Sequence, residues 1–551
     1  MGACFKGAFQ PVFENEFVWI EASRNSIFDN SHALNNIRAL LFRRPRPAND
    51  KVSISRTKLL LPSSLRQFLD HVANRRKLHI DTLTTFTNTT NQTMKYTYYI
   101  FLFILTLGTL DAAQATNQPS TLATNAPSDP SAVKKWQDDR FGMFIHWGPV
   151  SLTGKEISWS RGGKGTPVEV YDNLYKKFNP EKFNADEWVA AAKAAGMKYI
   201  VLTAKHHDGF CLWDTKLTDF NIMNSPFKRD VVKELAEACR KQGIKFGCYY
   251  SVPDTHNPDY PYDLTGSNHP KREKYDIQSY HKYLLGQTEE LIKNYGPLVT
   301  IWYDTDGTVS KVYGKNGYEV INLARSLQPD ILIDERTGAP GDYSTPEQRV
   351  GGFNMTRPWE SCMTISAHNH WAWGGEKDGT KPPGNVISML AQCAGGDGNM
   401  LLNVGPRPDG MIAPVQVDAI RQVGEWLKVN GESIYGTRGG PYMPTPRYTS
   451  TRKGNVIYLH ILKWDGNSCK LPPLGAEIVS SSLLAGGKVD VSNHPQGLAV
   501  TLPLTPAATP VSDIGKNAAD TVVKLELKGD AMAIQPIKPD PTEQQTAQEK
   551  K

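Results

Sequence analysis

The sequence has few cysteines for its length. Seven are spread over 551 residues, and no two of them form a Cys-x-x-Cys pair. This spacing excludes a disulfide framework and a zinc ribbon. We therefore expect most of the thiols to be unpaired and buried. No internal repeat is visible either, which excludes a repeat architecture.

Outside its first 115 residues, the chain has no excess of either charge. Those residues contain 14 Lys+Arg and 8 Asp+Glu and so carry the whole net charge of +6, while the remaining 436 residues contain 48 charges of each sign. A neutral body argues against electrostatic capture of nucleic acid or of an anionic membrane. We expect neither nucleic acid nor a membrane as a partner of the mature protein.

One apolar run, residues 98–107, is too short for a comfortable transmembrane helix. It follows Met94-Lys95 and precedes Ala113-Gln114-Ala115, a small-x-small cleavage site. This pattern predicts a signal peptide over 94–115, starting at Met94. Residues 1–93 would then be a non-native extension from a misplaced upstream start codon. The protein would be exported to a periplasmic, lysosome-like or extracellular location. The alternative is an internal membrane anchor behind a basic cytoplasmic arm.

The rest of the chain divides by composition into four parts. Residues 116–133 are rich in Thr, Ser, Pro and Asn and predict a flexible lead-in. Residues 134–438 alternate strand and helix patterns, which predicts a parallel sheet. Residues 439–530 carry short strands between Pro, Gly and Thr turns, as in an antiparallel β-sandwich. The polar remainder, 531–551, predicts a disordered tail.

The alternating region predicts an α/β fold, specifically an irregular (β/α)8-type barrel. Its length and strand count fit a barrel better than an open sheet, although one or two helices are hard to find. The expected strands lie near 142–145, 199–203, 245–251, 298–303, 331–333, 357–365 and 399–404. The expected helices lie near 184–195, 229–242, 274–294, 318–327 and 413–429.

Polar and aromatic residues follow the expected strands, and the carboxyl ends of barrel strands meet at one rim. The groups expected there are His146-Trp147, His206-His207-Asp208, Tyr249-Tyr250, Trp302-Tyr303-Asp304, Glu335-Arg336, Trp359-Glu360 and Asn403. A polar site walled by Trp and Tyr suits a carbohydrate. Asp304 ends a buried strand and is the first candidate for a catalytic group. Asp306 is interpreted as a turn-capping carboxylate.

The histidines admit more than one interpretation. His146, His206 and His207, with Asp208, could be zinc ligands. Adjacent residues of a strand point to opposite faces, however, so we expect only one of His206 and His207 to enter the site. Recognition of sugar hydroxyls is the favoured interpretation. A metal site and a structural rim histidine remain as alternatives.

A set of motifs between about residues 136 and 442 resembles one family. The motifs are GMFIHWG, KHHDGF, YYS, IWYD, Gly341-Asp342-Tyr343 with Thr345-Pro346-Glu347, WESCMT, and GGDGNMLLNVGP followed by PDG. In this order they resemble glycoside hydrolase family 29, the retaining exo-α-L-fucosidases. The resemblance implies an irregular (β/α) barrel followed by a β-sandwich. The sandwich would bury barrel surface or, alternatively, bind carbohydrate.

The resemblance also implies roles for particular residues. Asp304 would be the nucleophile and Glu347 the acid/base, with Glu335 and Glu360 as nearby competitors for the second role. Glu156 and Trp159 resemble the family's Glu-Trp pair, although two residues separate them here. The positions that would contact fucose are His146, Trp159, His206, His207, Tyr250, Trp302 and Arg336.

The expected reaction removes terminal fucose from a fucosylated oligosaccharide or glycoconjugate without a metal or organic cofactor. A retaining enzyme places its two carboxyl groups about 5–5.5 Å apart, one to attack and one to donate a proton. Two other functions remain open from the sequence. One is a barrel glycosidase acting on another sugar, and the other is a barrel that binds fucosylated glycans without cleaving them.

Overall fold

The computed structural model describes residues 129–265, 269–305, 316–503 and 520–540, all within one compact unit, Ser120–Lys551. The predicted upstream extension (1–93), the signal peptide (94–115) and most of the lead-in lie outside the described residues. Asp306 lies outside them as well. Among the helices of the described part, none is long and apolar enough to cross a bilayer.

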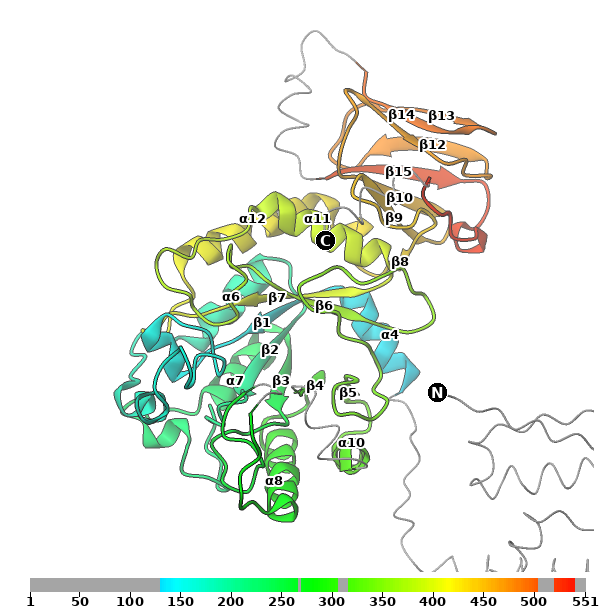
Figure 1. The fold of residues 1–551 in the computed structure, drawn as a ribbon. Helices are drawn as coiled ribbons and strands as arrows, with labels where there is room; N and C mark the ends of the chain where they lie inside the picture. The colour runs from blue at the N-terminus through cyan, green and yellow to red at the C-terminus, as the bar shows by residue number, and fades with distance from the viewer. Residues whose placement is uncertain (1–128, 266–268, 306–315, 504–519, 541–551) are drawn as a thin grey trace, which may run out of the picture. The chain divides into compact units, whose positions relative to one another are not determined.

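Seven parallel strands form a strongly curved sheet in the order β5-β4-β3-β2-β1-β7-β6 (Figure 1). Almost every residue in them is buried, as expected for a sheet covered on both faces. The strands are β1 (Phe141–Ile145), β2 (Tyr199–Lys205), β3 (Lys245–Ser251), β4 (Thr300–Asp304), β5 (Leu332–Ile333), β6 (Glu360–Thr364) and β7 (Asn399–Val404).

Helices connect most of these strands, and local sequence signals set their ends. Asn184 caps the first connecting helix by accepting the Glu187 N–H, and Asp230 caps the second by accepting the Lys233 N–H. Gly243 ends the second helix in the left-handed conformation. The helices are α6 (Ala185–Ala194), α7 (Val231–Gln242), α8 (Ile277–Tyr295), α10 (Asn316–Leu327), α11 (Pro383–Gly395) and α12 (Pro414–Asn430).

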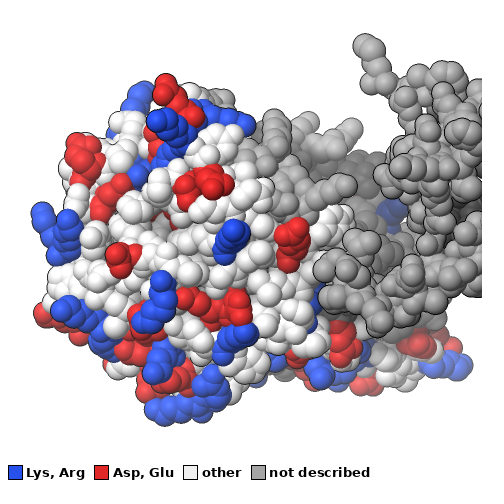
Figure 2. Space-filling model, turned by 90° about the horizontal axis from the view of Figure 1, so that it is seen from below, with Lys and Arg blue, Asp and Glu red and all other residues white. Residues whose placement is uncertain are grey.

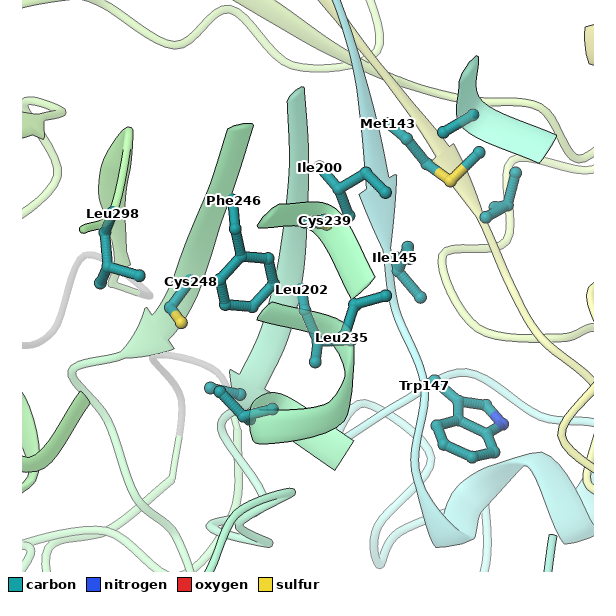
Figure 3. Packing of buried hydrophobic residues seen from close by; sticks show 14 of the residues in the cluster. Met143, Ile145, Trp147, Ile200, Leu202, Leu235, Cys239, Phe246, Cys248 and Leu298 are labelled. Atoms are coloured by element: carbon teal, nitrogen blue, oxygen red, sulfur yellow. The ribbon is translucent and has the colours of Figure 1, made fainter. Parts of the chain in front are cut away.

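The sheet separates two hydrophobic clusters. The outer cluster lies between the strands and the helices, where Leu235 and Cys239 of α7 face Ile200, Leu202 and Phe246 (Figure 3). The inner cluster fills the barrel and includes Phe144, Tyr249 and Trp302. Alternate residues of each strand thus serve opposite faces, and the inner set leads up to the carboxyl ends of the strands.

The barrel is irregular between β5 and β6. Within residues 334–359, all of which are described, there is no helix. Isolated parallel bridges instead join Tyr343 to Asp334, and Ser344 and Glu347 to Trp359 and Cys362. The segment 343–347 therefore occupies the place of an eighth strand. The predicted barrel is confirmed in this form, with seven strands in the described residues rather than eight.

The carboxyl-terminal strands form two antiparallel sheets around their own core, which includes Tyr448, Leu459, Val500 and Leu525. The five-stranded sheet has the order β12-β15-β10-β9-β8, and the three-stranded sheet β11-β14-β13. Their strands are β8 (Arg438–Gly439), β9 (Tyr448–Lys453), β10 (Val456–Ile461), β11 (Ser468–Leu471), β12 (Ile478–Leu483), β13 (Asp490–His494), β14 (Gly497–Thr501) and β15 (Thr521–Leu527).

Three details differ from the sequence prediction. A helix, α4 (Pro130–Asp139), occupies the end of the predicted lead-in, capped by the Asp129 side chain. The unpredicted helix α11 has Pro382 at its N-cap, without a side-chain cap, and no acidic residue in its first turn, so two of the usual start signals are missing. In the predicted disordered tail, Ile537 exchanges backbone hydrogen bonds with Pro441 and Met443, so 531–540 packs on the sandwich.

The distribution of surface charge and the state of the cysteines agree with what the composition predicts. On the face drawn in Figure 2, acidic and basic side chains are interspersed over the described part, without a large patch of one sign. The six cysteines in the described residues are all buried and form no disulfide bond with one another.

Candidate active site

A cavity lies at the carboxyl ends of the barrel strands and takes residues from widely separated segments. Both predicted catalytic carboxylates line it. Its lining consists of Phe144, His146, Trp159, His206, His207, Tyr249, Trp302, Asp304, Thr305, Arg336, Glu347, Cys362 and Trp371.

Asp304, the last residue of β4, is almost completely buried in this cavity. Its Oδ1 accepts hydrogen bonds from Arg336 Nη1 at 2.8 Å and from the Thr305 N–H at 2.9 Å. Its Oδ2 accepts the Tyr249 hydroxyl at 2.7 Å. Burial alone would raise the pKa of Asp304, but Arg336, His207 and the Tyr249 hydrogen bond outweigh it and hold that pKa below its usual value. Asp304 is therefore an anion at neutral pH.

Arg336 joins the two candidate carboxylates. Its Nη1 binds Asp304, and its Nη2 binds Glu347 Oε2 at 2.9 Å. Thr345 fixes the guanidinium by accepting from its Nε at 2.8 Å, and the guanidinium lies 4.6 Å from the centre of the Trp302 ring. Arginine suits this position because its planar group donates in two directions at once. Glu347 is the more exposed carboxylate, with 43% of its side chain accessible.

Three buried histidines also line the cavity. His146 Nδ1 donates to Asn403 Oδ1 at 2.6 Å, and burial lowers the pKa of His146 to about 3. Burial and the two neighbouring histidines also place the pKa of His206 well below its usual value. These two imidazoles are therefore neutral, and His146 Nε2 is an acceptor for a ligand hydroxyl. His207 Nε2 lies 3.6 Å from Asp304 Oδ2.

Both His206 and His207 line the cavity, so the expectation that only one would enter is wrong. Strand β2 ends at Lys205, and the two histidines lie in the turn that follows, where strand alternation no longer applies. Gly209 ends this turn with φ +83°, and a Cβ there would lie 2.2 Å from Asp254 Oδ1. Separate serine hydroxyls fix the rings, Ser158 on His206 Nδ1 and Ser251 on His207 Nδ1.

The tyrosine of the cavity is Tyr249, and the predicted contact Tyr250 lies on the other face of the sheet. Tyr249 pairs with Trp302 in the β3–β4 register, and both point into the barrel. Tyr250 belongs to the outer cluster, where its hydroxyl donates to Gln287 and accepts from Lys205. The one-residue error exchanges the two faces of the strand.

Sequence reasoning missed other residues of the cavity wall. Phe144 belongs to the inward-pointing set of β1, two residues before His146, so alternation contained a signal for it. Cys362 of β6 lies at the same level as Glu347 through an isolated bridge. Trp371 comes from the loop after β6 and lies 4.9 Å from His146 between ring centres. Loop residues of this kind carry no periodic signal.

The predicted Glu-Trp pair is split between two locations. Trp159 lines the mouth of the cavity and is 55% exposed. Glu156 does not line the cavity, and its carboxylate accepts the backbone N–H groups of Trp371 and Ala372.

The two competitors for the acid/base role lie elsewhere. Glu335 accepts the Thr345 N–H and pairs with Arg357, outside the cavity. Glu360 begins β6 and is fully buried in the barrel interior, where its Oε2 accepts the Tyr199 hydroxyl. Burial raises the pKa of Glu360 to about 7. Neither carboxyl reaches the space that Asp304 faces, whereas Glu347 does.

One group in the described residues has the spacing of metal ligands: His206, His207 and Asp304 offer ligand atoms within 4.8 Å of one another. Their contacts fit a metal poorly. Arg336 already provides a cation at 2.8 Å from Asp304, and the same carboxylate also accepts from Tyr249 and Thr305. A divalent ion at this carboxylate would have to compete with the guanidinium charge.

The chain matches known proteins over the barrel and beyond. Residues 109–432 match the family described as alpha-L-fucosidase. The human plasma alpha-L-fucosidase is 32% identical over 371 residues, covering 61% of this chain and 77% of the relative. The human tissue alpha-L-fucosidase is 29% identical over 420 residues, covering 69% and 88%.

Solved structures give the same result. Alpha-L-fucosidase isoenzyme 1 from Paenibacillus thiaminolyticus has a TM-score of 0.65 at 35% identity, covering 72% of this chain and 99% of its own. A Bacteroides thetaiotaomicron family-29 fucosidase, trapped as a covalent intermediate with 2-fluoro-fucosyl fluoride, has a TM-score of 0.64 at 27% identity, covering 74% and 98%. This chain therefore belongs to the α-L-fucosidases of glycoside hydrolase family 29.

Proposed function

We propose that this enzyme hydrolyses terminal α-L-fucosyl residues by double displacement, with Asp304 as the nucleophile and Glu347 as the acid/base. The observation that carries the assignment is the single guanidinium that contacts both carboxylates in one cavity. The retaining mechanism of the family requires such a facing pair. The substrate class is a fucosylated oligosaccharide or glycoconjugate.

In the first step, an Asp304 oxygen bonds to the anomeric carbon while the glycosidic C–O bond breaks. The electron pair leaves with the glycosidic oxygen, which takes a proton from Glu347. Asp304 is suited to attack because Arg336, His207 and Tyr249 keep it ionised despite its burial. The Glu347–Arg336 contact must open for Glu347 to act as a donor, and the exposed position of Glu347 allows this.

In the second step, Glu347 takes a proton from water, whose oxygen bonds to the anomeric carbon while the Asp304 ester bond breaks. Two inversions give net retention. The renewed contact with Arg336 suits the anionic form in which Glu347 begins this step. The neutral histidines bind sugar hydroxyls, and Trp302, Trp371 and Phe144 provide apolar walls. No step requires a metal, because Arg336 supplies the positive charge at Asp304.

An aryl α-L-fucoside assay with NMR detection of the first-formed anomer tests this function. We expect hydrolysis with α-L-fucose as the first product. Initial formation of β-L-fucose would contradict double displacement, and absence of hydrolysis would favour a glycan-binding role. An aryl α-galactoside with the same leaving group is the matched control, and we expect it to react far more slowly.

We also propose that the enzyme is exported through a signal peptide that starts at Met94 and is cleaved after Ala115. The charged start, the apolar run 98–107 and the Ala-Gln-Ala site support this. Amino-terminal sequencing of the protein from its native source tests it. We expect a mature terminus beyond Ala115, and a mature protein that retains residues before Met94 would contradict it.

A further inference from the structure

Glu156 lies outside the cavity but holds part of its wall in place. Its Oε2 accepts the Trp371 N–H at 2.8 Å, and its Oε1 accepts the Ala372 N–H at 2.9 Å. Trp371 and Ala372 lie 215 and 216 residues after Glu156 in the sequence. The carboxylate therefore connects the segment after β1 to the loop after β6. Trp371 is the only one of these three residues that lines the cavity.

The Trp371 backbone is held from its other side as well. Its carbonyl oxygen accepts Asn403 Nδ2 at 2.7 Å, and Asn403 Oδ1 accepts His146 Nδ1 at 2.6 Å. The indole ring lies 4.9 Å from the His146 ring. Glu156 and Asn403 therefore fix both the N–H and the C=O of one peptide segment, and the ring beside the cavity follows from that backbone position.

A carboxylate is the group that this position requires. Three backbone N–H donors converge on it: Oε2 accepts the Trp371 N–H, and Oε1 accepts those of Ala372 and Ile157. Burial raises the pKa of Glu156, whereas the three backbone hydrogen bonds and His370 favour its ionised form. Glutamine would offer a single acceptor oxygen and would point its NH₂ group at the N–H of Trp371 or at those of Ala372 and Ile157. Removal of one partner then leaves a donor unsatisfied.

We propose that Glu156 is a positioning residue that acts through Trp371, fixing the indole against His146 as a wall of the sugar subsite. The inference rests on the proposed fucosidase function. Glu156 contacts the loop backbone and does not line the cavity, so it acts on the sugar subsite only through Trp371.

A double-mutant cycle with Glu156→Gln and Trp371→Ala tests this inference. We expect Glu156→Gln to lower kcat/KM about ten- to hundredfold, mainly through KM, because a hydrogen bond to a charged group is lost. In the Trp371→Ala background the same substitution should cost less than about twofold, since the ring that Glu156 positions is gone. Affinity for a fucose-configured iminocyclitol should follow the same pattern.

Glu376→Gln is the matched control, because Glu376 lies on the same loop but is 67% exposed and pairs with Arg407. We expect its kinetics to match the wild type. If Trp371→Ala does not fold, Trp371→Phe replaces it in the cycle. Multiplicative losses in the double variant, or a lowered Tm without a change in KM, would overturn the inference. Failure of the wild type to hydrolyse aryl α-L-fucosides would instead overturn the proposed function.

Discussion

The two sides of the barrel contribute different groups to the cavity. From β1 to β4 the strands have five to seven residues, and capped helices separate them. This side supplies the three histidines, Tyr249 and Asp304. Between β5 and β6, strand β5 has two residues, and isolated bridges replace both a helix and a strand. This region supplies Arg336 and Glu347, and the loop after β6 adds Trp371.

The two regions therefore hold their functional groups in different ways. The regular side holds its groups by strand register and buried hydrogen bonds, which suits a nucleophile and hydroxyl-binding groups that should not move. The irregular side places Glu347 on a more exposed segment, which suits a group that must first give and then take a proton.

Loss of the nucleophile should have the largest effect. We expect Asp304→Gly to lower kcat by about 10⁴-fold or more, because no other group can form the covalent intermediate. Added azide should restore some turnover of an aryl α-L-fucoside and give β-L-fucosyl azide, since a single displacement inverts the anomeric carbon. Asp306→Ala is the control and should retain nearly full activity. Azide rescue with retained configuration would contradict the assignment.

Loss of the acid/base should depend on the leaving group. We expect Glu347→Ala to lower kcat/KM about 10²- to 10⁴-fold on a fucosyl disaccharide. The loss should be much smaller on an aryl fucoside whose phenolate leaves without a proton. Glu335→Ala, whose carboxylate lies outside the cavity in the same irregular region, is the control. Equal losses on both substrates would exclude the acid role.

Loss of Arg336, which contacts both Asp304 and Glu347, should change the pH profile of kcat/KM. In Arg336→Met the charge that lowers the pKa of Asp304 is lost, while its burial remains, so that pKa should rise. Protonated Asp304 cannot attack, and the acidic limb of the kcat/KM profile should therefore move to higher pH. Arg336→Lys should move it less but still lose activity, because lysine cannot contact both carboxylates in the same way. An unchanged acidic limb in Arg336→Met would contradict this account.

The adjacent tyrosines of β3 allow a narrower test. Tyr249→Phe removes the hydroxyl that contacts Asp304, and kcat/KM should fall about ten- to hundredfold. Tyr250→Phe removes a hydroxyl on the outer face, and its main effect should be about 1 kcal/mol lower stability. Kinetics and thermal unfolding of both variants distinguish the two faces. The reverse pattern would show that the strand register is misassigned.

Metal removal should have the smallest effect. We expect dialysis against EDTA to leave kcat and KM unchanged, because Arg336 occupies the position of a cation at Asp304. Assays with and without added Zn²⁺ provide the measurement. Loss of activity on chelation, restored by metal, would show that His206, His207 and Asp304 bind an ion.

The sequence predicts the regular side of the barrel well because the signals there are local. Asn184 and Gly243 mark helix ends, and the buried strand before Asp304 is continuous. Strand alternation is also a reliable signal when it is anchored on one known residue. Trp302 and Asp304 point inward, and the β3–β4 register then selects Tyr249 over Tyr250. The same rule failed for His206 and His207 because the strand ends one residue before them.

The irregular side is harder to predict, since its geometry depends on contacts between distant segments. Family motifs located Arg336 and Glu347, but no periodicity indicates that residues 343–347 take the place of a strand. Trp371 reaches the cavity through hydrogen bonds to Glu156 and Asn403, which no local pattern reveals. Prediction therefore stopped at the loops, where tertiary contacts decide which side chains face the substrate.

Trapping of the glycosyl-enzyme tests the central assignment most directly. The wild-type enzyme would be incubated with 2-fluoro-fucosyl fluoride, digested, and analysed by tandem mass spectrometry. We expect one 2-fluoro-fucosyl group per chain, attached to Asp304 in the peptide that follows Lys293. A label on Asp306 or Glu347, or no covalent adduct while the reagent inhibits the enzyme, would contradict the assignment of Asp304 as the nucleophile.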